Sequence, residues 1–451
     1  MITSPAFAGK RYAVLGLARS GIAAADALLA SGASVTVWDR NEAPRADFAG
    51  RAEIADPLEI DLTGFAGVVV SPGVPLNTHP IATRAAQFGV PVIGDIELFA
   101  QGRATLPPHK VVGITGTNGK STTTALVNHI LKTAGVPTTM GGNIGLPILG
   151  QEPLPAVGVY VLELSSYQID LTQSLDCDVA VLLNVTPDHL DRYESFEAYG
   201  ASKARLFGMS SGTHVDFTQG SGGPGQVRGD EAANFLTPVT PATEPGSSVL
   251  SAQAAWPSLQ GPHNAQNAAA AILVARALGI ADDVTGQALR TFTGLPHRME
   301  RVATHKGVLF VNDSKATNTD SSAPALAAYP PEGNGPRIHW IVGGLPKDDG
   351  LGATEAHLAN VKAAYTIGEA GPRFAELLES RLLVTRSEML CEAVWQAIAA
   401  AVPGDVVLLS PACASFDQFK DYEQRGDSFR QFVAALTEEP GSDPCGERHA
   451  A

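Results

Sequence analysis

Seven consecutive residues, Gly116 to Thr122, have the types and order of a turn that holds phosphate oxygens. The run reads G-T-N-G-K-S-T and follows the apolar stretch V-V-G-I-T. The backbone N–H groups of such a turn, with the N-terminus of the helix behind it, can converge on an anion. We assign nucleotide phosphate binding to Gly116, Thr117, Asn118, Gly119, Lys120, Ser121 and Thr122, where lysine adds a positive charge and Ser121 or Thr122 could ligate magnesium.

This run is shorter than the common phosphate-binding pattern. G-x-x-x-x-G-K-[ST] would require glycine at position 114, which is Ile114. The shortened form argues against ordinary kinases and motors. The alternative interpretation is a plain strand-to-helix turn in which a serine caps the helix.

Other chemically useful side chains follow apolar stretches predicted to be strands. Glu163 ends V-Y-V-L-E, and its carboxylate could hold Mg²⁺ directly or through water, unless it is a buried structural glutamate. Asp188 and His189 follow L-L-N-V-T-P, and the carboxyl ends of strands are where open α/β sheets bind ligands. Lys203 lies in a predicted helix, and the pattern alone favours a solvated lysine there.

A second glycine-bearing turn stands near the N-terminus. G-L-A-R-S-G supplies Gly16, Ala18 and Gly21, and Asp39 ends the next predicted strand at the distance expected for a ribose contact. Ala18 and Arg19 make a standard NAD site less favourable than a different nucleotide-like ligand. A strand-helix turn without any ligand is the alternative.

Polar side chains in the second half of the chain are also ligand candidates. Asn264 and Asn267 are three residues apart in a predicted helix and suit a purine edge or a ribose, although Asn264 could instead cap that helix. Arg298 follows His297 at a predicted domain boundary, where domain closure could bring its guanidinium onto a γ-phosphate. Further strand-end candidates are Asp313, Lys315, Thr317 and Ser415.

The elements that would position these residues alternate between strand and helix in three rounds. Such alternation predicts parallel sheets, hence an α/β fold with a Rossmann-like N-terminal domain, a central P-loop ATPase-like domain and a C-terminal Rossmann-like domain. We expect the boundaries at residues 1–98, 99–296 and 297–451. Glycine-rich residues 217–229 are expected to form a mobile surface loop, and polar residues 437–450 a disordered tail.

Composition limits the partners. With 46 acidic and 31 basic residues the net charge is −15, which opposes nucleic-acid binding. No stretch approaches the length of a membrane span, and the four cysteines lack the spacing of a zinc site or a disulfide framework. We expect a cytoplasmic monomer that contacts neither membrane nor nucleic acid.

Taken together, these stretches resemble the Mur ligase family, and the match is spread over the whole chain. The resemblance is carried by S-P-G at Ser71 to Gly73 and by G-D-I-E-L-F, G-T-N-G-K-S-T, G-G-N-I-G-L-P, L-E-L-S-S-Y-Q, L-N-V-T-P-D-H-L-D-R-Y, T-G-L-P-H-R-M-E, N-D-S-K-A-T-N and L-S-P-A-C-A-S-F-D-Q-F-K-D-Y-E-Q-R-G. The last block is the most discriminating, because the third domain of these ligases selects the incoming amino acid.

The resemblance, strongest to the members that add D-glutamate to UDP-N-acetylmuramoyl-L-alanine, implies ATP-driven amide formation. A γ-phosphoryl group would go to the substrate carboxylate, and the amine of D-glutamate would attack the acyl phosphate through a tetrahedral intermediate. A free carboxylate is a poor electrophile, so phosphorylation supplies a leaving group. The protein then needs mainly to position reactants and neutralise charge.

The resemblance also implies roles for single residues. Lys120 would contact the β- and γ-phosphates, Ser121 and Glu163 would hold a first Mg²⁺, and His189 and Lys203 a second, with Lys203 carbamylated by CO₂. The nucleotide contacts would be Asn264, Asn267, Arg298, Asp313 and Lys315. The uridine, diphosphate and muramoyl contacts would be Ser20, Asp39, Arg40, Ser71, Pro72, Gly73 and Asn143, with His189 at the substrate. The D-glutamate pocket would comprise Thr317, Lys347, Ser415 and Tyr422.

Two departures from the family pattern affect that pocket. The loop before Lys347 reads G-G-L-P-K-D-D-G, where relatives usually have a more polar, glycine-bearing run and Asp-Phe after the lysine. Tyr422 stands where phenylalanine is familiar, so its hydroxyl either adds a hydrogen bond or points to water.

Three rival interpretations remain. A sister ligase is the nearest, although folylpolyglutamate synthases normally lack the uridine-binding first domain. An NAD-linked oxidoreductase with a fused ATPase is supported by the first domain alone. A non-catalytic nucleotide sensor could keep the phosphate loop but would not need His189, Lys203 and Lys315 together.

Overall fold

The computed structural model describes residues 1–186, 188, 192–218, 239–241, 252–333, 335–346 and 350–438. Its strands are β1 Arg11–Leu15, β2 Ser34–Trp38, β3 Glu53–Ile54, β4 Phe65–Val70, β5 Val92–Ile93, β6 His109–Thr115, β7 Thr138–Gly142, β8 Gly158–Glu163, β9 Val179–Leu182, β10 Thr213–Asp216, β11 Val239–Pro241, β12 Glu300–His305, β13 Val308–Asn312, β14 Ile338–Gly343, β15 Val361–Ile367, β16 Leu383–Glu388 and β17 Val406–Leu409.

The α-helices are α1 Arg19–Ala30, α2 Glu42–Ala46, α3 Ile81–Gln87, α4 Asp95–Gly102, α5 Lys120–Thr133, α6 Ser166–Asp170, α7 Phe196–Gly208, α9 Pro262–Ala277, α10 Asp282–Thr291, α11 Thr319–Ala327, α12 Gly371–Leu378, α13 Leu390–Ala400 and α14 Tyr422–Glu438. Short 3₁₀ helices are Pro5–Phe7, Arg103–Thr105, Ile148–Gly150, Gln253–Ala255 and Gly352–Asn360.

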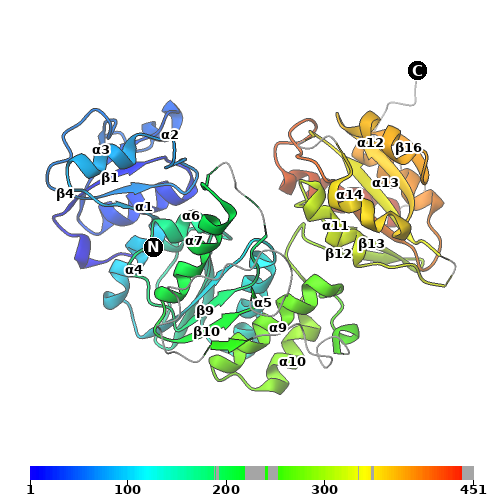
Figure 1. Cartoon of the computed structure of the whole chain (residues 1–451), viewed down its shortest axis with the longest axis horizontal. Coiled ribbons are helices and arrows are strands. Elements are labelled where there is room, and N and C mark those ends of the chain that lie inside the picture. The colour runs from blue at the N-terminus through cyan, green and yellow to red at the C-terminus, as the bar shows by residue number, and fades with distance from the viewer. Residues whose placement is uncertain are drawn as a thin grey trace. The chain divides into compact units, whose positions relative to one another are not determined.

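The first sheet has the strand order β3-β2-β1-β4-β5 and is parallel throughout. Side chains alternate between its faces. Tyr12 and Val14 of β1 join the hydrophobic cluster that contains the buried residues of α1, whereas Ala13 and Leu15 join the cluster that contains those of α3. Helices therefore cover both faces of this sheet (Figure 1), as the predicted Rossmann-like domain requires.

The middle sheet has the order β11-β10-β9-β6-β8-β7 and is also parallel. The cluster beneath α1 continues through Phe99 of α4 to Tyr160 and Leu162 of β8, so a single core supports the first two sheets. The ring of Phe99 lies 5.1 Å from that of Tyr160 at 65°. Because of this shared core, the first two sheets belong to one compact unit.

The third sheet has the order β12-β13-β17-β14-β15-β16. Its two faces bury separate clusters, one shared with α11 and α12 and the other with α13 and α14. Edge strand β12 is antiparallel to β13, which alternation of strand and helix does not predict. The cause is local: Lys306 and Gly307 have φ of 48° and 78°, the conformation of a tight two-residue hairpin turn.

Contacts divide the chain into two compact units, Met1–Val249 with Gln266–Leu289, and Leu250–Ala265 with Arg290–Ala451. The first unit holds the first two sheets and the second unit holds the third. The α/β class with three sheets is confirmed, and the residue boundaries at 98/99 and 296/297 stay a prediction.

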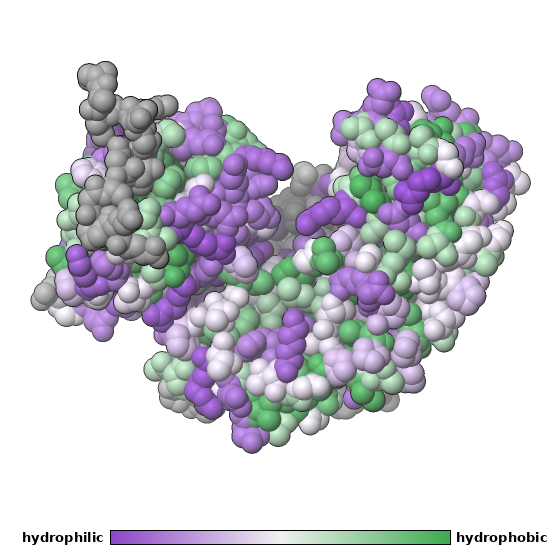
Figure 2. Space-filling model, turned by 180° about the vertical axis from the view of Figure 1, so that it is seen from behind, coloured by the Kyte–Doolittle hydropathy of each residue, from purple (hydrophilic) through white to green (hydrophobic). Residues whose placement is uncertain are grey.

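Several other expectations have mixed outcomes. The loop expected at 217–229 falls almost entirely outside the described residues, as does the expected tail after Glu438. Cys391 is disulfide-bonded, although the cysteine spacing suggested no disulfide framework, and Cys177 and Cys413 are buried. Over the described ranges no helix is long and apolar enough to span a bilayer. Hydrophilic and hydrophobic residues are interspersed over the side drawn in Figure 2.

Candidate active site

The glycine turn of the first domain is built around Asp39. The N–H of Leu17 donates to Asp39 Oδ2 at 2.7 Å, and Ser71 Oγ donates to the carbonyl of Gly16 at 2.7 Å. A side chain at Gly21 would bring its Cβ within 1.9 Å of the Gly16 carbonyl oxygen, so helix α1 can approach the turn only with glycine there. The fold thus gathers Gly16, Asp39 and Ser71 at one sheet edge.

Most of the other residues predicted to bind the uridine substrate belong to the first domain. Ser20 is half-buried in the first turn of α1, and Arg40 is exposed just after β2. Pro72 and Gly73 continue the loop after β4. Asn143 belongs to the middle sheet instead, where it follows β7.

The phosphate turn connects β6 to α5 through two glycines of positive φ. Gly116 has φ of 150° and Gly119 has φ of 84°. A Cβ at Gly119 would lie 2.2 Å from Asn267 Oδ1, so only glycine leaves this space open. Lys120 Nζ donates to the carbonyls of Gly116 at 2.9 Å and Thr117 at 2.7 Å, which folds the lysine over the turn. A phosphate group could replace these contacts.

Glu163 lies beside this turn because β8 pairs with β6. In the parallel register Ile114 is opposite Glu163. Asn143 Nδ2 donates to Glu163 Oε1 at 3.0 Å, whereas Oε2 is buried and has no hydrogen-bond partner among the described residues. An unpaired buried carboxylate oxygen fits a divalent cation, since burial of such an atom is otherwise costly.

The other metal-ligand candidates have different surroundings. Ser121 is buried in the first turn of α5, and Thr122 follows it there. His189 lies outside the described residues. Asp188, its described neighbour, contributes to the electrostatics of Lys203.

Lys203 is not the solvated lysine that pattern alone favours. It is 2% exposed in α7, and its Nζ donates to the Gly116 carbonyl at 3.0 Å and lies 4.5 Å from the ring centroid of Tyr199. Burial, followed by the positive charge of Lys120, lowers the pKa of the Lys203 amine to about 7. The side chain is therefore aimed at the phosphate turn, with a neutral form accessible near neutral pH.

Asn264 and Asn267 are both buried in α9, as their helical spacing predicts. Asn267 Oδ1 accepts a hydrogen bond from Thr123 Oγ1 at 3.3 Å, which brings Asn267 to the first turns of α5. Asn264 Nδ2 instead donates to the carbonyl of Gln260 at 3.0 Å.

Asp313 directly follows β13 and is a strongly perturbed carboxylate of the third domain. Ser410 Oγ donates to Asp313 Oδ2 at 2.8 Å and the Met299 N–H donates to Oδ1 at 3.1 Å. These contacts favour the charged form, yet burial outweighs them and raises the pKa of Asp313 to about 7. The positive charge of Arg298 acts on the same carboxylate, so the fold brings these two candidates together.

The described candidates for the D-glutamate pocket, Thr317, Ser415 and Tyr422, belong to the third sheet's unit, where Tyr422 is the first residue of α14. Lys315 Nζ, a predicted nucleotide contact, lies 3.9 Å from the ring centroid of the pocket candidate Tyr422. Thr317 is half-buried two residues further along, and Ser415 is buried on the loop after β17. Lys347 lies outside the described residues.

Arg425, which no sequence pattern singled out, organises these loops. It is 0% exposed, its Nε donates to Ser314 Oγ at 3.0 Å, and its Nη atoms donate to the carbonyls of Ser314, Cys413 and Ala414 at 2.9, 3.0 and 3.1 Å. Burial lowers the pKa of its guanidinium to about 10. A charged residue on a helix is ordinarily exposed, so hydropathy alone carries no signal for it.

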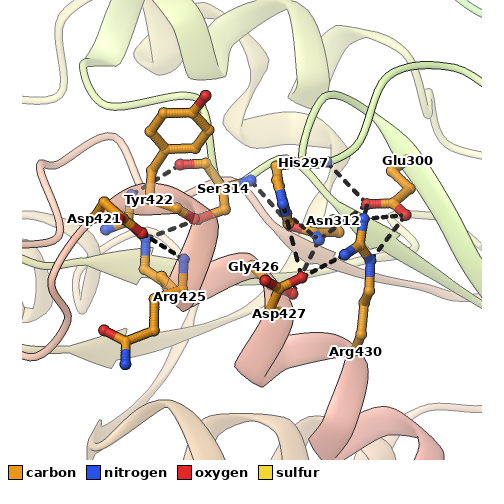
Figure 3. Close-up of polar contacts among 11 residues, drawn as sticks. His297, Glu300, Asn312, Ser314, Asp421, Tyr422, Arg425, Gly426, Asp427 and Arg430 are labelled. Atoms are coloured by element: carbon orange, nitrogen blue, oxygen red, sulfur yellow. Dashed lines mark hydrogen bonds and ion pairs between the residues drawn. The ribbon is translucent and has the colours of Figure 1, made fainter. Parts of the chain in front are cut away.

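A second polar network lies along the same helix (Figure 3). Asn312 Nδ2 donates to His297 Nδ1 and to Glu300 Oε2, each at 3.1 Å, and Arg430 Nη2 forms an ion pair with Glu300 Oε1 at 2.7 Å. A Cβ at Gly426 would lie 2.0 Å from His297 Nδ1. His297 is therefore a packed residue of the third domain, and burial lowers the pKa of its imidazole.

The chain has three sheets with helices packed on them. In the central sheet, a glycine turn and a lysine follow β6 and lie beside a buried carboxylate. These features define a multidomain nucleotide-binding α/β protein. Residues 114–217 match the Mur ligase middle domain, and residues 297–413 match the Mur ligase, glutamate ligase domain. The chain belongs to the Mur ligase family.

Two relatives illustrate how far the similarity extends. A UDP-N-acetylmuramoylalanine–D-glutamate ligase of Novosphingobium aromaticivorans is 66% identical over 99% of both chains. A ligase of the same name from Sphingopyxis alaskensis is 60% identical over 97% of this chain and 100% of its own.

Solved structures agree at the level of the fold. The UDP-N-acetylmuramate–alanine ligase of Thermotoga maritima superposes with a TM-score of 0.54 at 18% identity, covering 95% of this chain and 99% of its own. A MurF ligase of Thermotoga maritima in complex with ADP reaches 0.52 at 16% identity, covering 94% and 95%.

Proposed function

We propose that this chain is an ATP-dependent ligase that joins D-glutamate to UDP-N-acetylmuramoyl-L-alanine, giving ADP and phosphate, in the synthesis of peptidoglycan precursors. The observation that carries the proposal is 66% identity over 99% of both chains to a relative named for this activity. At that similarity the third domain, which receives the amino acid, is included in the match.

The proposed chemistry begins at the turn between β6 and α5. The substrate carboxylate attacks the γ-phosphorus of ATP, the bond to the β-phosphate oxygen breaks, and an acyl phosphate and ADP form. Lys120, folded over the turn by its contacts with Gly116 and Thr117, would move onto the β- and γ-phosphates as they enter. Arg298, Asp313, Lys315, Asn264 and Asn267 would complete the nucleotide contacts.

The amine of D-glutamate then attacks the acyl carbon. The tetrahedral intermediate loses inorganic phosphate and the amine releases a proton, which leaves an amide. Thr317, Lys347, Ser415 and Tyr422 would hold the two carboxylates of D-glutamate, because cations and hydroxyls suit that task. Ser20, Asp39, Arg40, Ser71, Pro72, Gly73 and Asn143 would hold the uridine substrate.

The buried Oε2 of Glu163, which has no hydrogen-bond partner among the described residues, supports a magnesium site. Ser121 and Glu163 would hold one ion, and His189 and Lys203 a second. Bound Mg²⁺ would neutralise charge on the transferring phosphoryl group. The residues of this chain would orient the phosphate turn and exclude water around it.

A carbamate on Lys203 belongs to the same proposal. The lone pair of a neutral amine attacks CO₂ and a proton leaves, which converts a cation into a carboxylate-like ligand. The burial of Lys203 and its pKa of about 7 support it, because a neutral amine is available near pH 7. Stripping bicarbonate should lower activity, and so should Lys203→Ala. A Lys203→Ala variant with wild-type kcat would contradict the carbamate.

We also propose that the enzyme acts in the cytoplasm as a monomer. The test of function is phosphate release by the purified full chain with ATP, Mg²⁺, UDP-N-acetylmuramoyl-L-alanine and a panel of amino acids. Turnover is expected with D-glutamate alone. Equal turnover with L-alanine, L-lysine or meso-diaminopimelate would refute the assignment.

A further inference from the structure

Arg192 connects the middle domain to the S-P-G loop of the first domain. Its Nη2 donates to the carbonyl of Gly73 at 3.0 Å, and its Nη1 donates to the carbonyl of Val74 at 3.3 Å. The same loop is tied to the first glycine turn, because Ser71 Oγ donates to the Gly16 carbonyl at 2.7 Å. One arginine side chain therefore holds the backbone of a loop more than a hundred residues earlier.

The guanidinium has an aromatic support behind it. Its central carbon lies 4.6 Å from the ring centroid of Tyr167, and Tyr167 stacks on Tyr193 with centroids 6.0 Å apart and planes at 8°. Tyr193 is fixed in turn by a hydrogen bond from its hydroxyl to Asp170 Oδ2 at 2.8 Å. A planar guanidinium can stack and donate twice in this geometry, which a lysine ammonium does not reproduce.

The tyrosine stack continues to the phosphate turn. The rings of Tyr193 and Tyr199 lie 5.3 Å apart, and the Tyr199 hydroxyl lies 3.2 Å from Thr117 Oγ1. Lys203 Nζ lies over the same Tyr199 ring. A continuous series of side-chain contacts thus runs from the loop at Gly73 to the turn that begins at Gly116.

We propose that Arg192 is a positioning residue, which sets the S-P-G loop at the correct place relative to the phosphate turn so that the uridine substrate presents its carboxylate to ATP. This inference rests on the proposed function. Both Nη atoms of Arg192 donate to backbone carbonyls, so its effect on an anionic substrate passes through the loop. Misplacement of reacting groups by about 1 Å is enough to slow such a reaction.

The test compares Arg192→Ala and Arg192→Lys with a matched control, Arg84→Ala. Arg84 makes the same two kinds of contact, with Nη2 donating to the Ile60 carbonyl at 3.0 Å and the guanidinium 4.6 Å from the Phe88 ring, but stays within the first domain. Calorimetry would give Kd for UDP-N-acetylmuramoyl-L-alanine and for a non-hydrolysable ATP analogue, alongside KM, kcat and Tm.

For Arg192→Ala we expect Kd for the uridine substrate to rise about tenfold, Kd for the ATP analogue to change less than about twofold, and Arg192→Lys to recover only part of the loss. Arg84→Ala should bind both ligands as the wild type does. Unchanged uridine-substrate affinity in Arg192→Ala would overturn the proposal, as would an equal loss for both ligands, or an equal loss in Arg84→Ala. If the wild type itself failed to bind the uridine substrate, the proposed function would fall first.

Discussion

The phosphate turn of the middle domain and the strand-end loops of the third domain are both ligand sites in the proposed enzyme, but they are held in different ways. The turn is shaped by Gly116 and Gly119, and its lysine rests on two carbonyls of the turn itself. The third-domain loops are joined by the fully buried Arg425. The first arrangement leaves contacts that a ligand can replace, whereas the second builds the loops into the core.

This difference predicts that activity and stability separate at the turn and fall together in the third domain. Lys120→Ala should lower kcat/KM for ATP about a thousandfold, because a charge aimed at the transferring phosphoryl group is removed. Its Tm should match the wild type. Lys132→Ala, at the exposed end of the same helix, is the control and should leave both quantities unchanged. A large fall in Tm for Lys120→Ala would undo the comparison.

In the third domain, Arg425→Met should lower stability and ligand binding together. It leaves Ser314, Cys413 and Ala414 without the donor they share, which should cost about 3 kcal/mol of stability and weaken D-glutamate binding. Calorimetric unfolding and KM for D-glutamate would measure the two effects. Arg373→Ala, which breaks an exposed ion pair, should change neither. A stable Arg425→Met variant with weak D-glutamate binding would mean that Arg425 acts on the ligand itself.

Asp313 gives the third domain a dependence on pH. Burial raises the pKa of this carboxyl from its ordinary 3.8 to about 7, so between these values the folded state keeps a proton that the unfolded state has released. The corresponding stability is present at low pH and is lost as the pH rises through 7. Asp313→Asn should therefore flatten the decline in stability between pH 5 and pH 8 by roughly 2 kcal/mol. The free energy of unfolding would be measured by calorimetry against pH for the wild type and Asp313→Asn. Equal slopes for the two would count against a raised pKa of Asp313.

Gly119→Ala should have the smallest effect of the four. A positive φ of 84° strains an alanine by about 1–2 kcal/mol, and the new Cβ would meet Asn267 Oδ1. Affinity for ATP should fall about tenfold. Gly135→Ala shares the strain, with φ of 72°, but no atom of the described residues lies within 4 Å of the new Cβ. It should lower Tm and leave ATP binding intact, and equal ATP affinities for both variants would show that the space at Gly119 is unimportant.

The same contrast explains what could be predicted from the sequence. The alternation of strands and helices and the G-T-N-G-K-S-T run predicted the three sheets and the phosphate turn, because glycine geometry and apolar patterning are local signals. The environment of Lys203 was not predictable from local pattern, since its Nζ donates to the Gly116 carbonyl, which lies 87 residues away in the chain. Arg425 and Arg192 carry no such signal either, because their partners are backbone carbonyls that become neighbours only after folding. The antiparallel β12 was missed because its turn, Lys306-Gly307, lacks the usual asparagine or aspartate.

The central claim is that the phosphate turn delivers its phosphoryl group to a carboxylate of the substrate. It can be tested with UDP-N-acetylmuramoyl-L-alanine carrying ¹⁸O in its carboxylate, using the wild-type chain, ATP, Mg²⁺ and D-glutamate. An acyl phosphate that is cleaved at its carbonyl carbon leaves one substrate oxygen on the released phosphate. We expect one ¹⁸O per phosphate in the mass spectrum of the released phosphate, and released phosphate without ¹⁸O would contradict transfer to the carboxylate.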